Sequence, residues 1–227
     1  TNAQEIKEAV TAGRWGFPFV QKTRTGGYDG QGVTVIRDAS ALENLFDAPS
    51  VLEQMCNIQK EIAVIVGRSG SGEIKTYDPV EMVFDPEANL IDYLRYPAEL
   101  ESTAAEKCRA IAQKTAESFA IEGLLAVELF LDQSGGIFVN EVAPRPHNSG
   151  HQSIESSVTS QYEQHLRIVL GMPLGNTDIK TPSIMLNVVG SKGSNGPTKV
   201  TGLKEWRCCS LHRVQYVLKS LPQEYSL

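Results

Sequence analysis

The sequence predicts an α+β fold whose strands pair mainly in an antiparallel way. Many short apolar segments are separated by brief turns containing glycine, serine or proline, which is typical of hairpins. Strands and helices also do not alternate one by one, as they do in a doubly wound parallel sheet. With 227 residues, the chain is long enough for one large domain or for two subdomains that share a cleft.

The composition argues against several functional classes. Hydrophobic residues make up 41% and charged residues 21% of the chain, as in an ordinary globular protein. The net charge of −6 and the lack of long basic runs argue against a nucleic-acid partner. No apolar run approaches the roughly 18 residues of a membrane span, and no secretory pattern opens the chain. We therefore expect a cytoplasmic protein without a membrane partner.

The cysteine pattern fits a reducing compartment. None of the four cysteines has the CxxC spacing of a metal site, and no disulfide framework is evident. They are Cys56, Cys108, Cys208 and Cys209. A zinc site is therefore not expected.

The first 60 residues read as a small α+β unit. The expected elements are a helix at 3–14 that ends near Gly13, strands at 17–22, 33–38 and 51–54, and a helix at 40–46 capped by Asp38 or Ser40. The segment KTRTGGYDGQG, from Lys22 to Gly32, joins the first two strands. Because clustered glycines cost backbone entropy on folding, we expect something to come close to this backbone.

A larger unit is expected over 61–190, followed by a separate segment at 191–227. The expected strands are 61–68, 74–84, 89–97, 124–131, 136–142 and 183–190, with helices at 102–121 and 157–171. Thr103 and Glu106 have the spacing of a capping box. The apolar face of the same helix is expected to contain Ala104, Cys108, Ile111, Thr115 and Phe119. The chain opens at Thr1, without a methionine and already in a helical pattern, so it is expected to be part of a longer protein.

Two glutamates on one predicted hairpin suggest a metal site. With the turn placed between Ser134 and Gly135, Glu128 faces Glu141, Leu129 faces Asn140 and Leu131 faces Phe138. Two opposed carboxylates destabilise a hairpin unless a cation lies between them or one is protonated. Magnesium prefers one or two carboxylates together with substrate phosphates, and Asn140 adds a neutral oxygen next to the pair. The alternative is a solvated strand face with a different register.

The segment directly after Glu141 is crowded with polar side chains. VAPRPHNSGH contains Arg145, His147, Asn148 and His151 within seven residues. Its two prolines and one glycine predict a shaped loop, and loops on a rigid scaffold commonly carry function. Arginine, histidine and asparagine beside a carboxylate pair indicate an anion site next to a metal.

Four stretches together resemble one family. QKTRTGGYDGQG, LEQMCNIQKE, AVELFLDQSGGIFVNEVAPRPHNSGH and SIMLNVVG are similar, in that order, to the ATP-grasp domain of the 5-(carboxyamino)imidazole ribonucleotide synthases, over roughly Glu5 to Val200. The resemblance implies two ATP-grasp subdomains that clamp ATP between them. It also implies a purine-biosynthesis ligase that uses ATP and bicarbonate to carboxylate 5-aminoimidazole ribonucleotide, with carboxyphosphate as the intermediate.

The same resemblance assigns roles to individual residues. Those implied to bind ATP are Lys22 at the phosphates, Glu53 and Gln54 at the adenine, and Glu61 at the ribose. Those implied to bind magnesium are Glu128 and Glu141, as the hairpin already indicates. Those implied to contact the aminoimidazole substrate are Tyr28 and Asp29, and those implied to surround bicarbonate and carboxyphosphate are Arg145, His147 and Asn148.

The chain departs from the family pattern in three places. Gln31 stands where many members have a basic residue, so one substrate contact is in doubt. The sequence after Glu205 lacks the basic stretch with which the family holds the substrate phosphate, and the N-terminal domain is absent. Three readings therefore stay open: a carboxylating ligase, an ATP-grasp ligase with another acceptor, and a fragment that binds ATP without catalysis or with uncoupled hydrolysis. A homodimer is kept as one option for the assembly.

Overall fold

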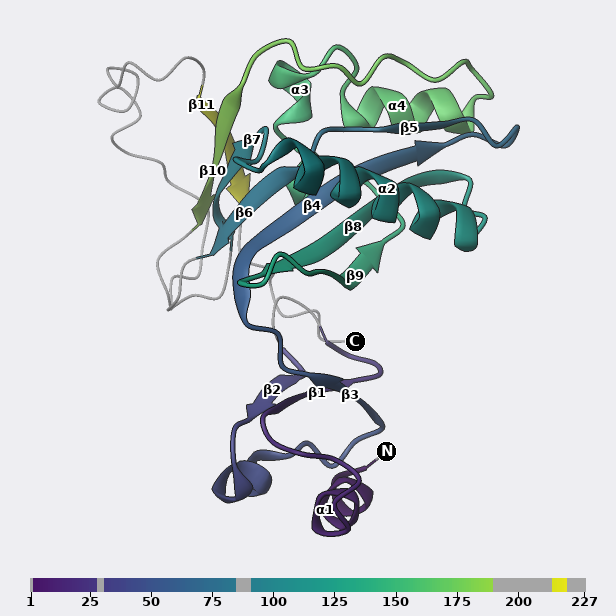
Figure 1. The fold of residues 1–227 in the computed structure, drawn as a ribbon. Helices are drawn as coiled ribbons and strands as arrows, with labels where there is room; N and C mark the ends of the chain where they lie inside the picture. Colours follow the sequence, from purple (N-terminus) through teal and green to yellow (C-terminus); the bar gives the residue numbers. More distant parts are fainter. Residues whose placement is uncertain (1, 28–30, 85–90, 190–213, 220–227) are drawn as a thin grey trace. The chain divides into compact units, whose positions relative to one another are not determined.

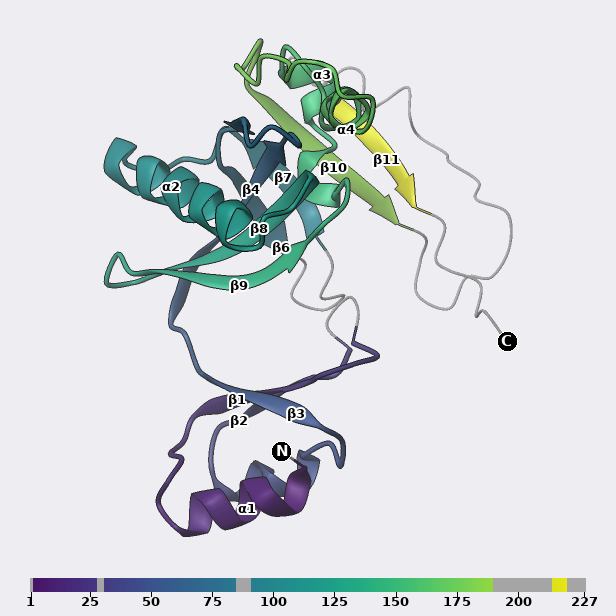
Figure 2. The same cartoon turned by 90° about the vertical axis from the view of Figure 1, so that its right-hand side faces the viewer.

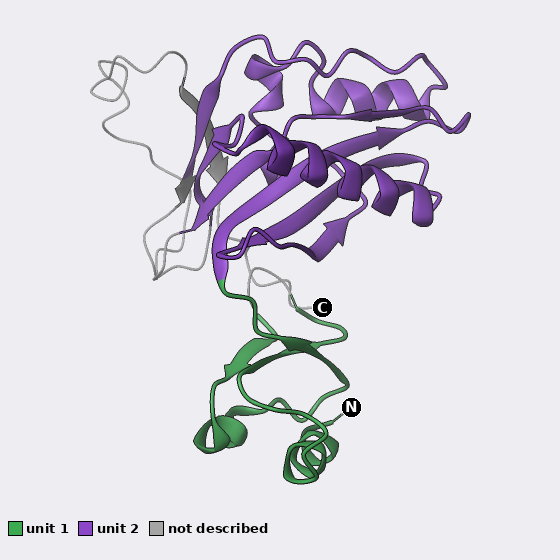
Figure 3. Ribbon diagram, in the orientation of Figure 1, with its two compact units in different colours: residues 1–57, 86–90 green, residues 58–85, 91–227 purple. Residues whose placement is uncertain are grey.

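The computed structural model describes residues 2–27, 31–84, 91–189 and 214–219 (Figure 1). They form two compact units, which divide between Asn57 and Ile58 (Figure 3). Both units combine helices with antiparallel strands, so the predicted α+β class is confirmed. Within the described ranges, no helix has the length and apolar character needed to cross a membrane.

The first unit is a three-stranded antiparallel sheet, in the order β2-β1-β3, with a helix and a 3-10 helix. Its elements are α1 (Ala3–Thr11), β1 (Phe19–Thr23), β2 (Val33–Ile36), η1 (Ala39–Asn44) and β3 (Ser50–Gln54). Ile6 of α1 packs against Phe19 and Ile36 of the sheet, and all three are fully buried. One face of the small sheet therefore forms its core.

Short polar caps set the ends of the helices in this unit. The Asn2 side chain accepts the Glu5 N–H at 3.0 Å and starts α1, which ends just before Gly13. Asp38 caps the next helix by accepting the Ser40 N–H at 2.9 Å. The helix expected at 40–46 is a 3-10 helix, and it ends at Asn44 because Leu45 returns to extended backbone.

The base of the glycine-rich loop explains one of its glycines. The Thr23 N–H donates to the Gly32 carbonyl at 2.9 Å, which closes the β1–β2 connection. Gly32 has a φ of +76°, and a Cβ there would lie 2.3 Å from Thr23 Oγ1. The close approach at this position therefore comes from the chain itself. Residues 28–30 lie outside the described part of the chain.

The second unit contains an eight-stranded sheet with the order β11-β10-β7-β6-β4-β8-β9, in which β5 also pairs with β4. Only β10 and β11 pair in parallel among the described strands. The strands are β4 (Ile58–Arg68), β5 (Ile74–Thr76), β6 (Val80–Phe84), β7 (Ile91–Tyr96), β8 (Gly123–Asp132), β9 (Ile137–Ala143), β10 (Ser183–Val189) and β11 (Val214–Lys219). The helices are α2 (Ser102–Ser118), η2 (Asn148–Gly150), α3 (Ser153–Ser156) and α4 (Gln161–Val169).

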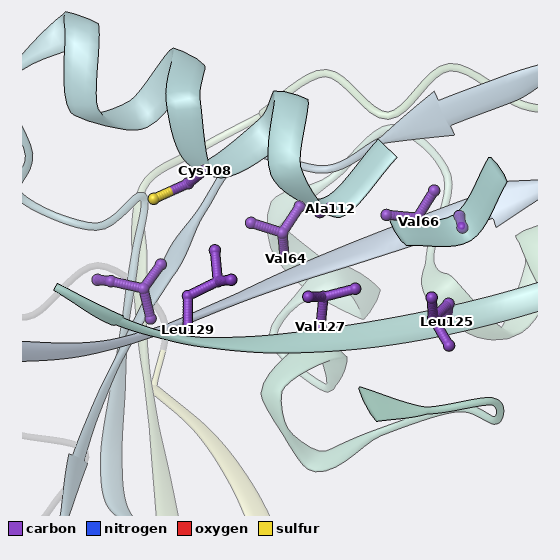
Figure 4. Close-up of a cluster of buried hydrophobic side chains, with 9 residues drawn as sticks. Val64, Val66, Cys108, Ala112, Leu125, Val127 and Leu129 are labelled. Carbon is purple, nitrogen blue, oxygen red and sulfur yellow. The ribbon is translucent and has the colours of Figure 1, made fainter. Parts of the chain in front are cut away.

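Helix α2 covers one face of this sheet with an apolar core (Figure 4). The sheet residues of this core alternate along β4 and β8, and they are Ile62, Val64, Val66, Leu125, Val127 and Leu129. They pack against Cys108, Ala112 and Ala116 of the helix. Phe119, which was expected on this face, is 62% exposed, because it lies after the last residue of α2. The expected capping box is also wrong: Glu101 precedes the helix, which has no side-chain cap.

Helix α4 packs on the opposite face of the same strands (Figures 1 and 2). Ile168 of α4 contacts a cluster that contains Ile65, Leu124 and Ala126, the neighbours of the α2-facing residues. The helix begins four residues later than expected, because Ser157 forms a bridge with Ile179. Strands β4 and β8 are therefore covered on both faces.

Candidate functional site

The two predicted carboxylates face each other on the β8–β9 hairpin. Glu128 is the register partner of Glu141, so this prediction is confirmed. Glu128 is 9% exposed, whereas Glu141 is exposed on the edge strand β9. Directly opposed residues of an antiparallel pair have Cβ atoms about 4.5–5.5 Å apart. A half-buried pair of carboxylates at this spacing favours a cation between them.

The rest of the predicted register is wrong, and two offsets explain why. The Asp132 N–H donates to the Gly136 carbonyl at 2.9 Å, so the turn is centred on Ser134 and not after it. Leu131 therefore faces Ile137 instead of Phe138. Leu129 likewise faces Val139 instead of Asn140. A β-bulge between these pairs and Glu128 shifts the register back by one residue, and so restores the Glu128–Glu141 pair.

The extra residue of this bulge is Asn140. In a β-bulge two residues of one strand oppose one residue of its partner, so Asn140 and Glu141 both lie opposite Glu128. Bulges often occur beside functional sites, where they redirect a side chain. Two carboxylates and one amide oxygen are thus collected at one point of the sheet, which is the ligand chemistry that magnesium prefers.

This donor set fits a metal that is shared with a ligand. In the described part of the chain, no three His, Cys, Asp or Glu side chains form a cluster suited to a metal ion. A metal cage built only from protein side chains is therefore not seen in these ranges. Magnesium does not require one, because it usually binds one or two carboxylates and completes its shell with phosphates and water.

A third glutamate lies on the same face of the sheet. On β4, Ala63 is the partner of Glu128, and Glu61 lies two residues before Ala63. Since residues two apart in a strand share a face, Glu61 and Glu128 both lie on the α4 side. Burial raises the pKa of the Glu61 carboxyl above its ordinary value.

His147 lies against the buried carboxylate. Its Nε2 is 3.5 Å from Glu128 Oε1, and its side chain is 10% exposed. On the other side of the ring, Nδ1 accepts the Ser149 N–H at 3.3 Å and lies 2.8 Å from the Ser149 hydroxyl. Because Nδ1 accepts from the backbone, the ring proton is placed on Nε2, facing Glu128.

The backbone of His147 is held by a residue that sequence reasoning missed. Gln161, the first residue of α4, accepts the His147 N–H at 2.9 Å and donates to its carbonyl at 2.7 Å. Gln161 is fully buried, and a Cβ on Gly150 would lie 2.4 Å from its Oε1. We call these two hydrogen bonds between Gln161 and the His147 backbone the clasp. The Gln161 side chain fits only because position 150 is a glycine. A signal was present in the sequence: Ser160 and Glu163 have capping-box spacing, and Ser160 does cap α4.

Arg145 and Asn148 flank His147 with hydrogen-bonding capacity left over. Arg145 is exposed, and its Nη1 donates to the Pro146 carbonyl at 3.1 Å. The Oδ1 atom of Asn148 is buried and has no hydrogen-bond partner within the described ranges. A buried acceptor left unmatched costs about 1–3 kcal/mol, so a ligand with an N–H or O–H group would satisfy it. The Arg145 guanidinium can donate two parallel hydrogen bonds, which suits the binding of an oxyanion.

The remaining predicted residues lie in the first unit. Lys22 of β1 forms an ion pair with Glu53 of β3, with Nζ 2.8 Å from Oε2. The structure thus brings together two residues that were assigned to different parts of ATP. Gln54 is exposed at the end of β3. Tyr28 and Asp29, the predicted substrate residues, lie outside the described residues.

The comparisons with known proteins agree with the motifs. Residues 1–162 match the ATP-grasp domain family. The phosphoribosylaminoimidazole carboxylase of Ogataea methanolica is 41% identical over 196 residues, which cover 82% of this chain and 36% of that protein. The N5-carboxyaminoimidazole ribonucleotide synthase of Bacillus subtilis is 41% identical over 192 residues, which cover 83% of this chain and 50% of that protein. The chain thus spans half or less of the length of these relatives.

Solved structures of the same group share the fold. The N5-carboxyaminoimidazole ribonucleotide synthetase of Thermotoga maritima has a TM-score of 0.73 at 41% identity, covering 81% of this chain and 48% of that chain. The Aspergillus clavatus synthase in complex with ADP and 5-aminoimidazole ribonucleotide has a TM-score of 0.74 at 31% identity, covering 85% and 51%. This chain therefore belongs to the ATP-grasp family, and within that family it is similar to the N5-carboxyaminoimidazole ribonucleotide synthases.

Proposed function

We propose that this chain acts in the ATP-dependent carboxylation of 5-aminoimidazole ribonucleotide with bicarbonate. The single observation that carries the proposal is the Glu128–Glu141 pair beside the buried His147. Relatives in the same group provide further support, since one solved structure contains ATP and another contains ADP with the aminoimidazole ribonucleotide. The products are 5-(carboxyamino)imidazole ribonucleotide, ADP and phosphate, a step in purine biosynthesis.

The proposed nucleotide residues occur in both units. Lys22 contacts the phosphates, Glu53 and Gln54 recognise the adenine, and Glu61 accepts hydrogen bonds from the ribose hydroxyls. In the described structure the Lys22 ammonium is paired with Glu53, so phosphate binding exchanges or extends this ion pair. Glu61 must be ionised to accept two ribose hydroxyls well, and burial opposes that ionisation. Its contribution to binding should therefore increase with pH.

Glu128, Glu141 and Asn140 are the proposed magnesium ligands. When bound, the ion supplies charge neutralisation for the transferring phosphoryl group. The protein's own part is to keep two carboxylates at one point of a rigid sheet, which the bulge at Asn140 achieves. Without a cation the Glu128 and Glu141 carboxylates repel each other. A bound cation would remove this repulsion, and the relief would add to its binding free energy.

Arg145, His147 and Asn148 are the proposed catalytic residues. A bicarbonate oxygen attacks the γ-phosphorus, ADP leaves, and carboxyphosphate forms. The substrate amine then attacks the carbonyl carbon, phosphate leaves, and the amine loses its proton. The Arg145 guanidinium binds the oxyanion. Asn148 Oδ1 accepts a hydrogen bond from the O–H of bicarbonate or from the N–H of the substrate amine. His147 Nε2 is placed to position the reacting groups beside Glu128. Tyr28 and Asp29 are proposed to contact the aminoimidazole.

Product release tests the function directly. ADP formation should depend on bicarbonate and should be stimulated by the aminoimidazole ribonucleotide. Stimulation by biotin or glycinamide ribonucleotide would indicate another acceptor. Bicarbonate-dependent ADP release without any response to the three acceptors would indicate uncoupled hydrolysis and contradict the proposal.

Calorimetry tests the nucleotide site separately. Lys22→Ala should weaken the binding of Mg·ATP at least tenfold, about 1.4 kcal/mol. Lys75→Ala is the matched control, because Lys75 is an exposed lysine on β5 of the other unit. Equal affinities for wild type and Lys22→Ala would remove Lys22 from the site.

A further inference from the structure

Of the four candidate residues in the VAPRPHNSGH segment, His151 alone has no role in the proposed chemistry. It is half-buried and lies at the C-terminal end of the 3-10 turn η2, where its N–H donates to the Asn148 carbonyl at 3.1 Å. In a 3-10 helix the side chains at positions i and i+3 eclipse each other. The His151 side chain therefore lies on the same side of the turn as the Asn148 side chain.

The clasp fixes the orientation of the Gln161 amide. Its Oε1 accepts the His147 N–H at 2.9 Å, and its Nε2 donates to the His147 carbonyl at 2.7 Å. Exchanging the two amide atoms would break both hydrogen bonds, because N–H would then face N–H and C=O would face C=O. Gln161 Nε2 is therefore a donor to every group that approaches it.

This donor fixes the tautomer of the His151 ring. Gln161 Nε2 lies 3.3 Å from His151 Nδ1, and the Tyr162 hydroxyl hydrogen-bonds the same nitrogen. A proton on Nδ1 would point at the amide N–H, so Nδ1 is an acceptor and the Tyr162 O–H donates to it. The ring proton is therefore carried by Nε2. The Tyr162 ring also stacks on the His151 ring, with centroids 5.8 Å apart, and limits rotation of the imidazole.

A donor and a buried acceptor thus occur on one side of this turn. The donor is His151 Nε2, and the acceptor is Asn148 Oδ1, which has no hydrogen-bond partner among the residues that the structure describes. Bicarbonate has one O–H group and two other oxygens that share a negative charge. It can therefore donate to the Asn148 oxygen and accept from the imidazole at the same time. An anion without an O–H group would leave the buried oxygen unsatisfied.

We propose that His151 is a further bicarbonate-binding residue, which donates its Nε2–H to one bicarbonate oxygen while Asn148 Oδ1 accepts the bicarbonate O–H. The inference deepens the proposed function and rests on it for the identity of the anion. The Arg145 guanidinium supplies charge, whereas His151 and Asn148 recognise which oxygen carries the proton. This recognition leaves the third oxygen to attack the γ-phosphorus.

Nuclear magnetic resonance of the 227-residue chain with isotope-labelled histidine tests the proposal without turnover. Proton–nitrogen correlation spectra should show the His151 proton on Nε2, and titration with bicarbonate should shift the His151 signals. Nitrate has the same planar shape and charge but no O–H, so it should bind at least tenfold more weakly. His165, one turn after Gln161 on α4, is the internal control, and its signals should not move.

Two substitutions separate bicarbonate binding from support of the loop. A glutamine amide reaches about as far as histidine Nε2, whereas an asparagine amide reaches only as far as Nδ1. His151→Asn should therefore raise both the bicarbonate Kd and the bicarbonate KM for ADP release at least tenfold, with the KM for ATP within about twofold of wild type. His151→Gln should keep the bicarbonate KM within about threefold of wild type. His165→Asn is the matched control and should change neither quantity, and thermal melts by circular dichroism confirm that each variant is folded.

The outcomes distinguish this inference from the proposed function. Bicarbonate-dependent ADP release with an unchanged bicarbonate KM in His151→Asn would overturn the inference and leave the proposed function standing. A His151 ring protonated on Nδ1, signals that do not shift with bicarbonate, or equal affinities for nitrate and bicarbonate would also overturn it. Bicarbonate that shifts the His151 signals of a chain without ADP release would instead contradict the proposed function and support the inference.

Discussion

The two faces of the eight-stranded sheet are built from alternating residues of the same strands, yet they differ sharply. On the α2 side, β4 and β8 contribute only aliphatic side chains to the buried core, and Cys108 and two alanines of the helix pack against them. On the α4 side, the same strands carry Glu61 and Glu128 next to apolar residues, and His147, whose backbone is held by Gln161, lies against Glu128.

This difference separates stability from chemistry. The α2 face is dry and tightly packed, and its residues contribute by removing apolar surface from water. The α4 face keeps titratable groups half-buried, where their charges are poorly solvated and interact strongly with a ligand. A rigid apolar face behind each strand therefore fixes the positions of the carboxylates in front of it.

The largest expected effect comes from removing a side chain on the dry face. Leu129→Ala should lower the free energy of unfolding by about 2–5 kcal/mol, because Leu129 is fully buried in the α2 core. The neighbouring change Glu128→Gln, on the other face, should alter it by less than about 1 kcal/mol. Urea denaturation measures both. Equal losses would show that the two faces do not divide their roles.

A smaller effect is expected from Gly150→Ala. The added Cβ would lie 2.4 Å from Gln161 Oε1, so it should displace the clasp on His147. Overpacking of this kind typically costs about 1–3 kcal/mol, and the disturbed His147 loop should also reduce ADP release. The control is Gly16→Ala, where a Cβ would meet nothing within 4 Å and should change neither quantity. A fully active Gly150→Ala variant would show that the clasp is dispensable.

The sequence predicted the elements well and their ends less well. Strand positions follow from apolar patterning and turn residues, and the strands at 51–54 and 183–190 lie within one residue of β3 and β10. The start of α4 depends instead on the pairing of Ser157 with Ile179, which lies 22 residues away. Long-range contacts of this kind leave no local signal.

The site shows the same limit more clearly. The sequence placed Glu128 opposite Glu141 correctly, although it missed both the turn centre and the bulge, and these two offsets cancel. The clasp by Gln161 was missed because it joins residues 14 positions apart through a buried amide. Side-chain bonds to a distant backbone can be recognised only once the fold brings the segments together.

The smallest effect concerns the pH dependence of stability. Burial raises the pKa of Glu61 above 4.5, its ordinary value. At pH values above 4.5 the carboxyl ionises more readily in the unfolded chain than in the folded one, so Glu61 lowers the free energy of unfolding there. Glu61→Gln should therefore unfold like wild type below about pH 4.5 and be more stable than wild type above the raised pKa. Thermal melts between pH 4 and pH 8 measure the difference. A gap that does not change with pH would contradict the burial of this carboxyl.

The central claim is that Glu128 and Glu141 hold magnesium together with nucleotide phosphates, and calorimetric titration of ATP with and without magnesium tests it most directly. Wild type should bind ATP at least tenfold more tightly with magnesium present. Glu128→Gln and Glu141→Gln should each lose most of this gain, whereas Glu106→Gln, a change on the exposed side of α2, should keep it. Full magnesium dependence in both site variants would contradict the claim.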